Sequence, residues 1–500
     1  RERDGNLSAA PLLLEGQTGN QLIVTIRDIT NEMLHQQKLS AIHKAGIELA
    51  DLTPQEVFDM QVEDRIELLN PELNAYCTLM ADSAREAARE ADDKLSRGEE
   101  PGPLHGVPLS IKDNLFVRDS RTTFGSKLHE HDITGEDAPI TERLKDAGAI
   151  ILGRTNSPEF GWKGVTDNLV FGITRNPWNL ELTPGGSSGG GSAAVAAGLG
   201  PIGIGTDGGG SLRIPASFCG LVGLKASYGR VPTWPGVSVG SLRHVGGMTR
   251  TVEDSALLLN VIAGPDDRDP DSLPAEDVDY LAEIGRGIEG MRLAYSPEMG
   301  FATVDPEVAS LCEQAAMRLS EAGAVVEQVQ LDWKDPYQAW KVFFYGGSAA
   351  RLGRVLEEQG HLLDPGLRAC VEEAVTLTGL DYSDALAGRN EFWHQVRTVY
   401  EAFDVLLTPT LPVLPFPVGQ DNADPFPGKP QGELQWTQFT YPINLTGQPA
   451  ASVPAGWTGE NLPVGLQVIG RRFDDRMVLR VAGAIEQLQP WSDRWPELSL

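Results

Sequence analysis

Apolar and polar positions follow different patterns before and after about residue 67. Residues 21–30 (QLIVTIRDIT) alternate between apolar and polar side chains and are rich in β-branched residues, which predicts an edge strand. Residues 31–52 follow with the pattern of a polar helix. We therefore expect an atypical N-terminal segment at residues 1–66, a strand plus a helix, and a separate domain at residues 67–500.

Beyond residue 67, predicted helices alternate with short apolar strands. Residues 81–95 (ADSAREAAREADDKL) are rich in Ala, Glu and Arg, which favours a helix. Residues 106–113 (GVPLSIKD) predict an apolar strand with a charged tip. Residues 147–152 (AGAIIL) predict a buried strand after a helix at residues 139–146. Alternation of this kind predicts an α/β fold with a mostly parallel sheet.

Acidic side chains dominate the charge of the 500-residue chain, whose net charge is −29. A surface this acidic repels phosphate backbones, so we expect no nucleic-acid partner; high solubility is its simplest consequence. No apolar run reaches the roughly 18 residues that span a bilayer. The N-terminus has no apolar stretch typical of an export signal. We therefore expect no membrane association.

The cysteines also bear on the compartment and on metal binding. They are scattered and form no CxxC pair, which argues against a disulfide framework or a zinc site. Widely spaced free thiols fit a reducing environment, so we expect a cytoplasmic protein. The four residues are Cys77, Cys219, Cys312 and Cys370.

The densest chemical signal lies at residues 183–220 (TPGGSSGGGSAAVAAGLGPIGIGTDGGGSLRIPASFCG). Two serines embedded in glycine precede a helix of small residues, and a second Gly-Ser turn follows. Glycine lets the backbone approach a ligand closely, and successive N–H groups in such turns can bind a developing oxyanion. The alternative is a flexible Gly/Ser linker. Apolar helix and strand patterns flank the run in place of polar spacer, which favours a site.

Three other motifs compete for this region. Residues 185–189 match the GxSxG nucleophile elbow, which requires an acid and then a histidine downstream. Only His244, His361 and His394 follow, none in a recognisable catalytic setting. Residues 198–203 match GxGxxG but follow a helix where the dinucleotide motif follows a strand. Neither GxxxxGK[ST] nor HExxH occurs, so we expect no cofactor and no metal.

The spaced blocks of this sequence resemble those of the amidase signature family. The blocks are GGSSGG, GTDGGGSLRIP, FCGLVGLK, HGVPLSIKDN, PEFGWKGVTDN, FGITRNPWN, YGRVP, NLTGQPAASVPAG and LPVGLQVIG, spread over residues 67–487. The resemblance implies one large α/β/α domain with a mixed twisted sheet. It also implies hydrolysis of a carboxamide to a carboxylate plus ammonia or an amine through an acyl-enzyme. Within residues 1–66, IRDIT and KLSAIHKAG resemble the tail of a PAS sensor domain and its signalling helix.

The resemblance assigns the reactive roles to three residues. Ser211 matches the nucleophile, and Ser187 matches the bridging serine, which in this family follows a cis peptide bond. Lys112 matches the base, which can act only when neutral and therefore must be desolvated. A solvated surface lysine is the alternative for Lys112. Cys219 is a competing nucleophile by chemistry, but its Phe-Cys-Gly setting favours a small buried packing residue.

Further roles follow from the same resemblance. Backbone N–H groups of Gly208, Gly209, Gly210 and the nucleophile would form the oxyanion hole. Ser188, Asp207 and Arg213 would support the site through a polar network, with no action on the substrate.

The predicted substrate is a small-molecule amide, with its preference set by variable aromatic segments. Candidate segments are Trp162, Phe171, Trp178, residues 336–351 and residues 436–441. The resemblance leaves the oligomeric state open, a homodimer included.

Other functions compete with a stand-alone hydrolase. One is the glutaminase subunit of a tRNA-dependent amidotransferase, an assembly protein of the same family. That subunit usually carries Gln where this chain has Ile214. Another is an amidase regulated by the PAS-like segment. A catalytically dead scaffold is disfavoured because all three reactive positions are present.

Overall fold

The structure is a computed structural model that describes residues 61–235, 241–423 and 435–498. The strand and helix predicted at residues 21–30 and 31–52, and with them the PAS-like resemblance, lie outside the described residues. Among the residues that are described, no helix has the length and apolar character needed to cross a membrane.

Eleven strands form one mixed sheet. Their spatial order is β1 (Tyr76–Leu79), β3 (Ile150–Thr155), β2 (Pro108–Lys112), β6 (Ile202–Asp207), β8 (His244–Thr249), β7 (Val222–Lys225), β12 (Ala450–Trp457), β13 (Pro463–Ile469), β11 (Val405–Pro409), β9 (Arg292–Tyr295) and β10 (Val325–Gln328). A separate pair joins β4 (Asp167–Asn168) and β5 (Gly172–Ile173). Strand β2 pairs in parallel with β3 and β6, and β9 pairs in parallel with β10 and β11.

The remaining neighbours in the large sheet are antiparallel, which confirms the mixed sheet. The narrower expectation of a mostly parallel sheet is wrong. Strands β12 and β13 are joined by a short hairpin, and such a connection needs no crossover helix. The alternation of helices and strands seen in the first third of the chain does not continue at β12 and β13.

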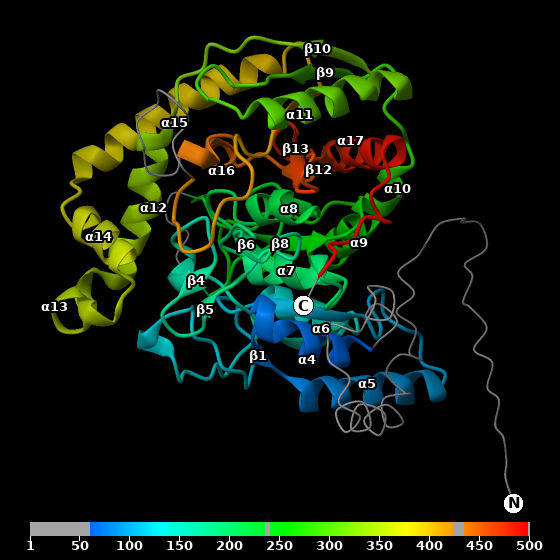
Figure 1. Ribbon diagram of the computed structural model, residues 1–500, viewed down its shortest axis with the longest axis vertical. Helices are drawn as coiled ribbons and strands as arrows, with labels where there is room; N and C mark the ends of the chain where they lie inside the picture. Colours follow the sequence, from blue (N-terminus) through cyan, green and yellow to red (C-terminus); the bar gives the residue numbers. More distant parts are fainter. Residues whose placement is uncertain (1–60, 236–240, 424–434, 499–500) are drawn as a thin grey trace, which may run out of the picture.

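Helices cover both faces of the sheet (Figure 1). One face packs against α6 (Pro139–Asp146), α9 (Val252–Ile262), α10 (Tyr280–Ile284), α11 (Pro306–Arg318) and α17 (Asp475–Leu488). The other face contacts α4 (Val62–Leu73), α5 (Ala81–Ser96), α7 (Gly189–Ala196), α8 (Arg213–Cys219), α15 (Gly379–Val399) and α16 (Tyr441–Thr446). Helices α12 (Tyr337–Leu352), α13 (Leu356–Gln359) and α14 (Pro365–Ala374) lie beside α15 at one side of the molecule. This three-layer arrangement confirms the predicted α/β/α fold.

Neighbouring residues of one strand separate the two cores. Leu293 and Tyr295 of β9 belong to the large cluster under α11 and α17, whereas Ala294 belongs to the cluster under α15 and α16. This is the period-two alternation of a strand that is buried on both faces. The sheet therefore forms the middle layer of the fold.

The predicted elements near the site are recovered, with one shift. The helices predicted at residues 81–95 and 139–146 are α5 and α6. The strand predicted at residues 147–152 instead begins at Ile150. The N–H groups of Ala147 and Gly148 donate to carbonyls of the last turn of α6, so these residues still belong to the end of the helix.

Parallel pairing brings the ends of β2 and β6 together. Lys112 is the last residue of β2 and Asp207 the last of β6, so both lie at the same edge of the sheet. Helix α7 lies directly on β6 because the strand has glycine on that face. A Cβ at Gly203 would lie 2.9 Å from a carbonyl oxygen of α7, and one at Gly205 would lie 2.5 Å from the Ser188 hydroxyl.

Candidate active site

Lys112 is fully buried and contacts three hydroxyl groups. Its Nζ lies 2.7 Å from Ser187 Oγ, 3.1 Å from Ser188 Oγ and 3.1 Å from Thr206 Oγ1. Burial, and after it the nearby Arg243 guanidinium, lowers the pKa of Lys112 well below its usual value, against the opposing field of Asp207. A solvated surface lysine is therefore excluded, and a neutral amine is the favoured form.

Ser188, the N-cap residue of α7, orients this amine. Its hydroxyl donates to the Thr206 carbonyl at 3.2 Å and accepts from the Thr206 N–H at 3.3 Å. Because the only hydroxyl hydrogen is used in this way, Ser188 can only accept a hydrogen bond from Lys112. Asn114 donates its Nδ2 hydrogen to Thr206 Oγ1 at 3.2 Å, which fixes the second hydroxyl beside the amine.

Ser187 and Ser211 both line one cavity at this edge of the sheet. The Gly186–Ser187 peptide bond is cis, as the resemblance predicts. Ser188 N–H donates to the Ser211 carbonyl at 3.3 Å, which joins the two serine-bearing loops. Ser211 is 9% exposed, and among the described residues its hydroxyl has no hydrogen-bond partner. The hydroxyl is therefore available to a ligand in the cavity.

In the loop that leads to Ser211, one backbone N–H group donates within the loop, and others have no protein acceptor among the described residues. Gly210 N–H, which we expected in the oxyanion hole, donates to Asp207 Oδ1 at 2.8 Å. Trp340 Nε1 donates to the Gly208 carbonyl at 3.0 Å, and Thr440 Oγ1 donates to the Gly209 carbonyl at 2.7 Å. In this part of the described chain the N–H groups of Gly208, Gly209 and Ser211 donate to no protein atom. Because the Gly208 and Gly209 carbonyls are held by Trp340 and Thr440, the free N–H groups of this loop are suited to bind a negatively charged oxygen.

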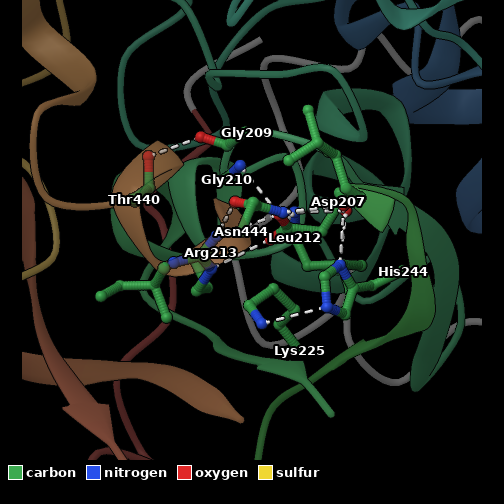
Figure 2. Close-up of polar contacts among 12 residues, drawn as sticks. Asp207, Gly209, Gly210, Leu212, Arg213, Lys225, His244, Thr440 and Asn444 are labelled. Carbon is green, nitrogen blue, oxygen red and sulfur yellow. Dashed lines mark hydrogen bonds and ion pairs between the residues drawn. The ribbon is translucent and has the colours of Figure 1, made fainter. Parts of the chain in front are cut away.

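Asp207 connects this loop to the rest of the domain (Figure 2). Its carboxylate accepts from Arg213 Nε and a terminal guanidinium nitrogen, both at 3.0 Å, and from Asn444 Nδ2 at 2.9 Å. Arg213 also donates to Asn444 Oδ1 at 2.7 Å and to Gln467 Oε1 at 2.6 Å. Burial alone would raise the pKa of Asp207, but Arg213, with Lys225, outweighs it and holds that pKa below its usual value. Asp207 and Arg213 thus belong to one buried polar network, and their supporting role in catalysis stays a prediction.

A second buried lysine lies behind the same loop (Figure 2). Lys225 Nζ donates to the Gln448 carbonyl and lies 3.3 Å from His244 Nε2. His244 Nδ1 donates to the Leu242 carbonyl at 2.8 Å, which leaves Nε2 as the acceptor. Burial, then the Lys225 charge, lowers the pKa of His244 well below its usual value. This histidine supports the loop from behind and does not line the cavity.

Sequence reasoning missed several members of this network. Asn444 and Gln467 stand inside the quoted blocks NLTGQPAASVPAG and LPVGLQVIG, so a signal was present, but nothing in the sequence paired them with Arg213. Lys225 ends the quoted block FCGLVGLK. His244 had no local signal, because its role depends on the pairing of β8 with β6.

The cavity has a volume of about 240 Å³, and its wall includes several aromatic side chains. Of the aromatic residues expected to set substrate preference, Trp162 and, from segment 336–351, Phe343 and Phe344 line it. The others do not: Phe171 contacts Arg121, Trp178 packs on Trp457, and Trp436 stacks on Phe218. Wall residues that we did not anticipate include Asn114, Phe124, Phe160, Leu242 and Arg243, whereas Arg351 is the last residue of the expected segment 336–351.

Cys219 is a packing residue, as expected. Its side chain is buried at the end of α8, and burial raises the pKa of its thiol, which disfavours the reactive thiolate. Within the described ranges, no cluster of three or more His, Cys, Asp or Glu residues could hold a metal ion.

Comparison with known proteins gives matches over most of the described chain. The family model described as Amidase matches residues 61–479. An acylamidase of Rhodococcus erythropolis is 39% identical over 94% of this chain and 99% of its own. A glutamyl-tRNA(Gln) amidotransferase subunit of Carboxydothermus hydrogenoformans is 37% identical over 92% of this chain and 98% of its own. The structure of a bacterial aryl acylamidase of the amidase signature family superimposes with a TM-score of 0.81 and 32% identity, over 88% of this chain and 94% of that one.

Proposed function

The chain belongs to the amidase signature family and is a hydrolase acting on amide bonds, and we propose that Ser211, Ser187 and Lys112 perform the hydrolysis. The observation that carries this assignment is the burial of Lys112 with its amine 2.7 Å from Ser187 Oγ. Serine is a weak nucleophile unless a base lies next to it, and a lysine is a base only when desolvated. Ser211 supplies the hydroxyl that faces the cavity.

Proton transfer follows from the hydrogen-bond capacities around the amine. A neutral lysine has two hydrogens and one lone pair. Donation to Ser188 and Thr206 uses the hydrogens, so the lone pair faces Ser187. Ser187 gives its proton to Lys112 and takes the Ser211 proton as Ser211 Oγ attacks the substrate carbonyl carbon.

The attack moves an electron pair onto the carbonyl oxygen. The free N–H groups of Gly208, Gly209 and Ser211 are the donors available to this oxyanion. When the intermediate collapses, the C–N bond breaks and the proton held by Lys112 returns through Ser187 to the leaving amine or ammonia. The acyl group stays on Ser211 until water attacks by the same relay and releases the carboxylate.

Three variants and one matched control test the assignment. Ser211→Ala, Ser187→Ala and Lys112→Ala are assayed for ammonia or amine release on aliphatic, aryl and amino-acid amides. Each should lose about 10³-fold or more in kcat, because the three residues act as one unit. Ser383→Ala, an exposed serine on α15, should match the wild type. If Ser211→Ala retains wild-type turnover, the nucleophile is wrongly assigned.

A second candidate is the glutaminase subunit of a tRNA-dependent amidotransferase, favoured by the likeness to the Carboxydothermus protein. Ile214 argues for the stand-alone enzyme. It is 2% exposed in an apolar cluster with Val165 and Trp436, where a glutamine would lose its hydrogen bonds to water. The purified chain should therefore hydrolyse amides without partner subunits. Activity that appears only in a hetero-oligomer would favour the second candidate.

The remaining proposals concern the substrate, the location, the assembly and the regulation of the enzyme. A small-molecule substrate fits the cavity volume of about 240 Å³, and the acidic surface supports the proposal that no nucleic acid binds directly. Four free cysteines support a cytoplasmic location. The oligomeric state is left open, a homodimer included, and gel filtration would measure it. Of the atypical segment 1–66, deleting residues 1–60, which spares α4, tests regulation by the PAS-like segment: unchanged activity would leave that idea without support.

A further inference from the structure

The cavity at Ser211 has the opposite charge to the chain around it. The chain carries 70 acidic and 41 basic residues. In contrast, the described cavity wall contains Arg243 and Arg351 and neither Asp nor Glu. Arginines without acidic partners attract anions, and the low-dielectric wall of a cavity focuses that attraction.

Arg243 has N–H donors that no protein group among the described residues uses. It precedes β8, is half-buried, and donates to the Pro235 carbonyl at 3.2 Å, with no ion pair among the described residues. Asp269 exerts an opposing field, but its carboxylate accepts from the Thr233 N–H at 2.8 Å. Burial, and then the field of Arg351, lowers the pKa of Arg243 to about 10. The two guanidinium groups therefore repel each other, and a nearby negative charge would relieve that repulsion.

Arg351 is held by aromatic faces. Its guanidinium carbon lies 5.3 Å from the Phe160 ring centre and 6.0 Å from that of Phe124, and these two rings stack on each other at 5.6 Å. A guanidinium held against ring faces keeps its in-plane N–H groups available for a ligand. No ion pair engages them in the part of the chain that the structure describes.

We propose that the amide substrate also carries a carboxylate, which Arg243 and Arg351 bind while Ser211 attacks the amide carbonyl. Guanidinium groups match carboxylates with paired N–H donors, which gives orientation as well as affinity. A small cavity with the reactive hydroxyl and the two cations in one wall suits linear monoamides of dicarboxylic acids. The inference rests on the proposed amide hydrolysis at Ser211 and specifies its substrate class.

Matched substrate pairs test the proposal in the full-length protein. The kcat/KM for ammonia release is measured for succinamate against butanamide and for adipamate against hexanamide, which share chain lengths and differ in the carboxylate. The wild type should prefer the charged member of at least one pair by about tenfold or more. Arg243→Gln and Arg351→Gln should each lower that preference about tenfold, and Arg→Lys at the same positions should restore part of it. Arg354→Gln, an exposed position outside the cavity wall, should leave the ratio unchanged.

Inhibition of the wild type gives an independent measurement if a variant fails to fold. Adipate should inhibit hydrolysis at concentrations about tenfold below those of hexanoate. Equal rates on both members of every pair, together with equal inhibition, would overturn the carboxylate site and leave amide hydrolysis intact. Failure of the wild type to release ammonia or amine from any amide would instead overturn the proposed catalytic assignment.

Discussion

Replacing Asp207 by asparagine tests how the nucleophile loop is held. The carboxylate accepts from Gly210 N–H and Leu212 N–H as well as from Arg213 and Asn444. Asparagine keeps the shape and one acceptor oxygen but removes the charge that compensates Arg213. Both members of this ion pair are 0% exposed, so solvent does not screen the loss. Removing one partner of a buried pair costs about 3–5 kcal/mol, and we expect a loss of unfolding free energy in that range.

Urea denaturation of the wild type, Asp207→Asn, Arg213→Met and the double variant measures this coupling. The double variant should lose at least about 2 kcal/mol less than the sum of the singles, because no charge is left unpaired. Asp207→Asn should also lower kcat by about 10²-fold or more, since the loop that bears the N–H donors is released. The exposed Asp93→Asn is the control. Wild-type stability for Asp207→Asn, or additive losses, would refute this account of the loop.

Three further predictions concern the same region. A Cβ at Gly209 would lie 2.7 Å from the Trp340 ring, so Gly209→Ala should lower kcat about tenfold or more by displacing the loop. The control is Gly135→Ala, whose Cβ would meet no atom within 4 Å and which should leave kcat unchanged. Equal kcat values for the two variants would contradict the loop geometry. Burial, then the Arg213 charge, lowers the pKa of Lys225 to about 7. Between pH 7 and about 10 the unfolded chain therefore binds more protons at Lys225 than the folded chain does, so the contribution of Lys225 to the free energy of unfolding rises with pH. If the difference in that free energy between the wild type and Lys225→Met does not change with pH, this account of Lys225 is wrong. Cys219→Ala should keep kcat within about twofold in the amide assay, since its thiol only packs, whereas loss of activity would reopen the thiol as nucleophile.

The sequence predicts the reactive residues but not the environment that makes them reactive. Lys112 was assigned by a motif at the tip of a strand, and nothing local indicated a neutral amine. Its three hydroxyl partners come from the start of α7 and the end of β6, 75 to 94 residues later. Parallel pairing of β2 with β6 brings them together, and strand pairing is a tertiary property.

Position in a motif also failed to predict which amide hydrogens remain free. All three glycines of the loop looked equivalent, yet the Gly210 N–H turns back to Asp207. The residues that line the cavity could not be predicted from local sequence either. Arg243 and Arg351 are far apart in the chain, and no local pattern distinguishes them from surface arginines, so their shared cavity emerges only from the packing of α12 beside the nucleophile loop.

The central claim is that Ser211 carries the acyl group during amide hydrolysis, and trapping that intermediate tests it most directly. The wild type is mixed with an activated aryl amide, quenched in acid, digested and analysed by mass spectrometry. We predict the mass of the acyl group on the peptide that contains Ser211, and no such mass on that peptide from Ser211→Ala. An acyl group found on Ser187 or Cys219, with Ser211 unmodified, would contradict the claim.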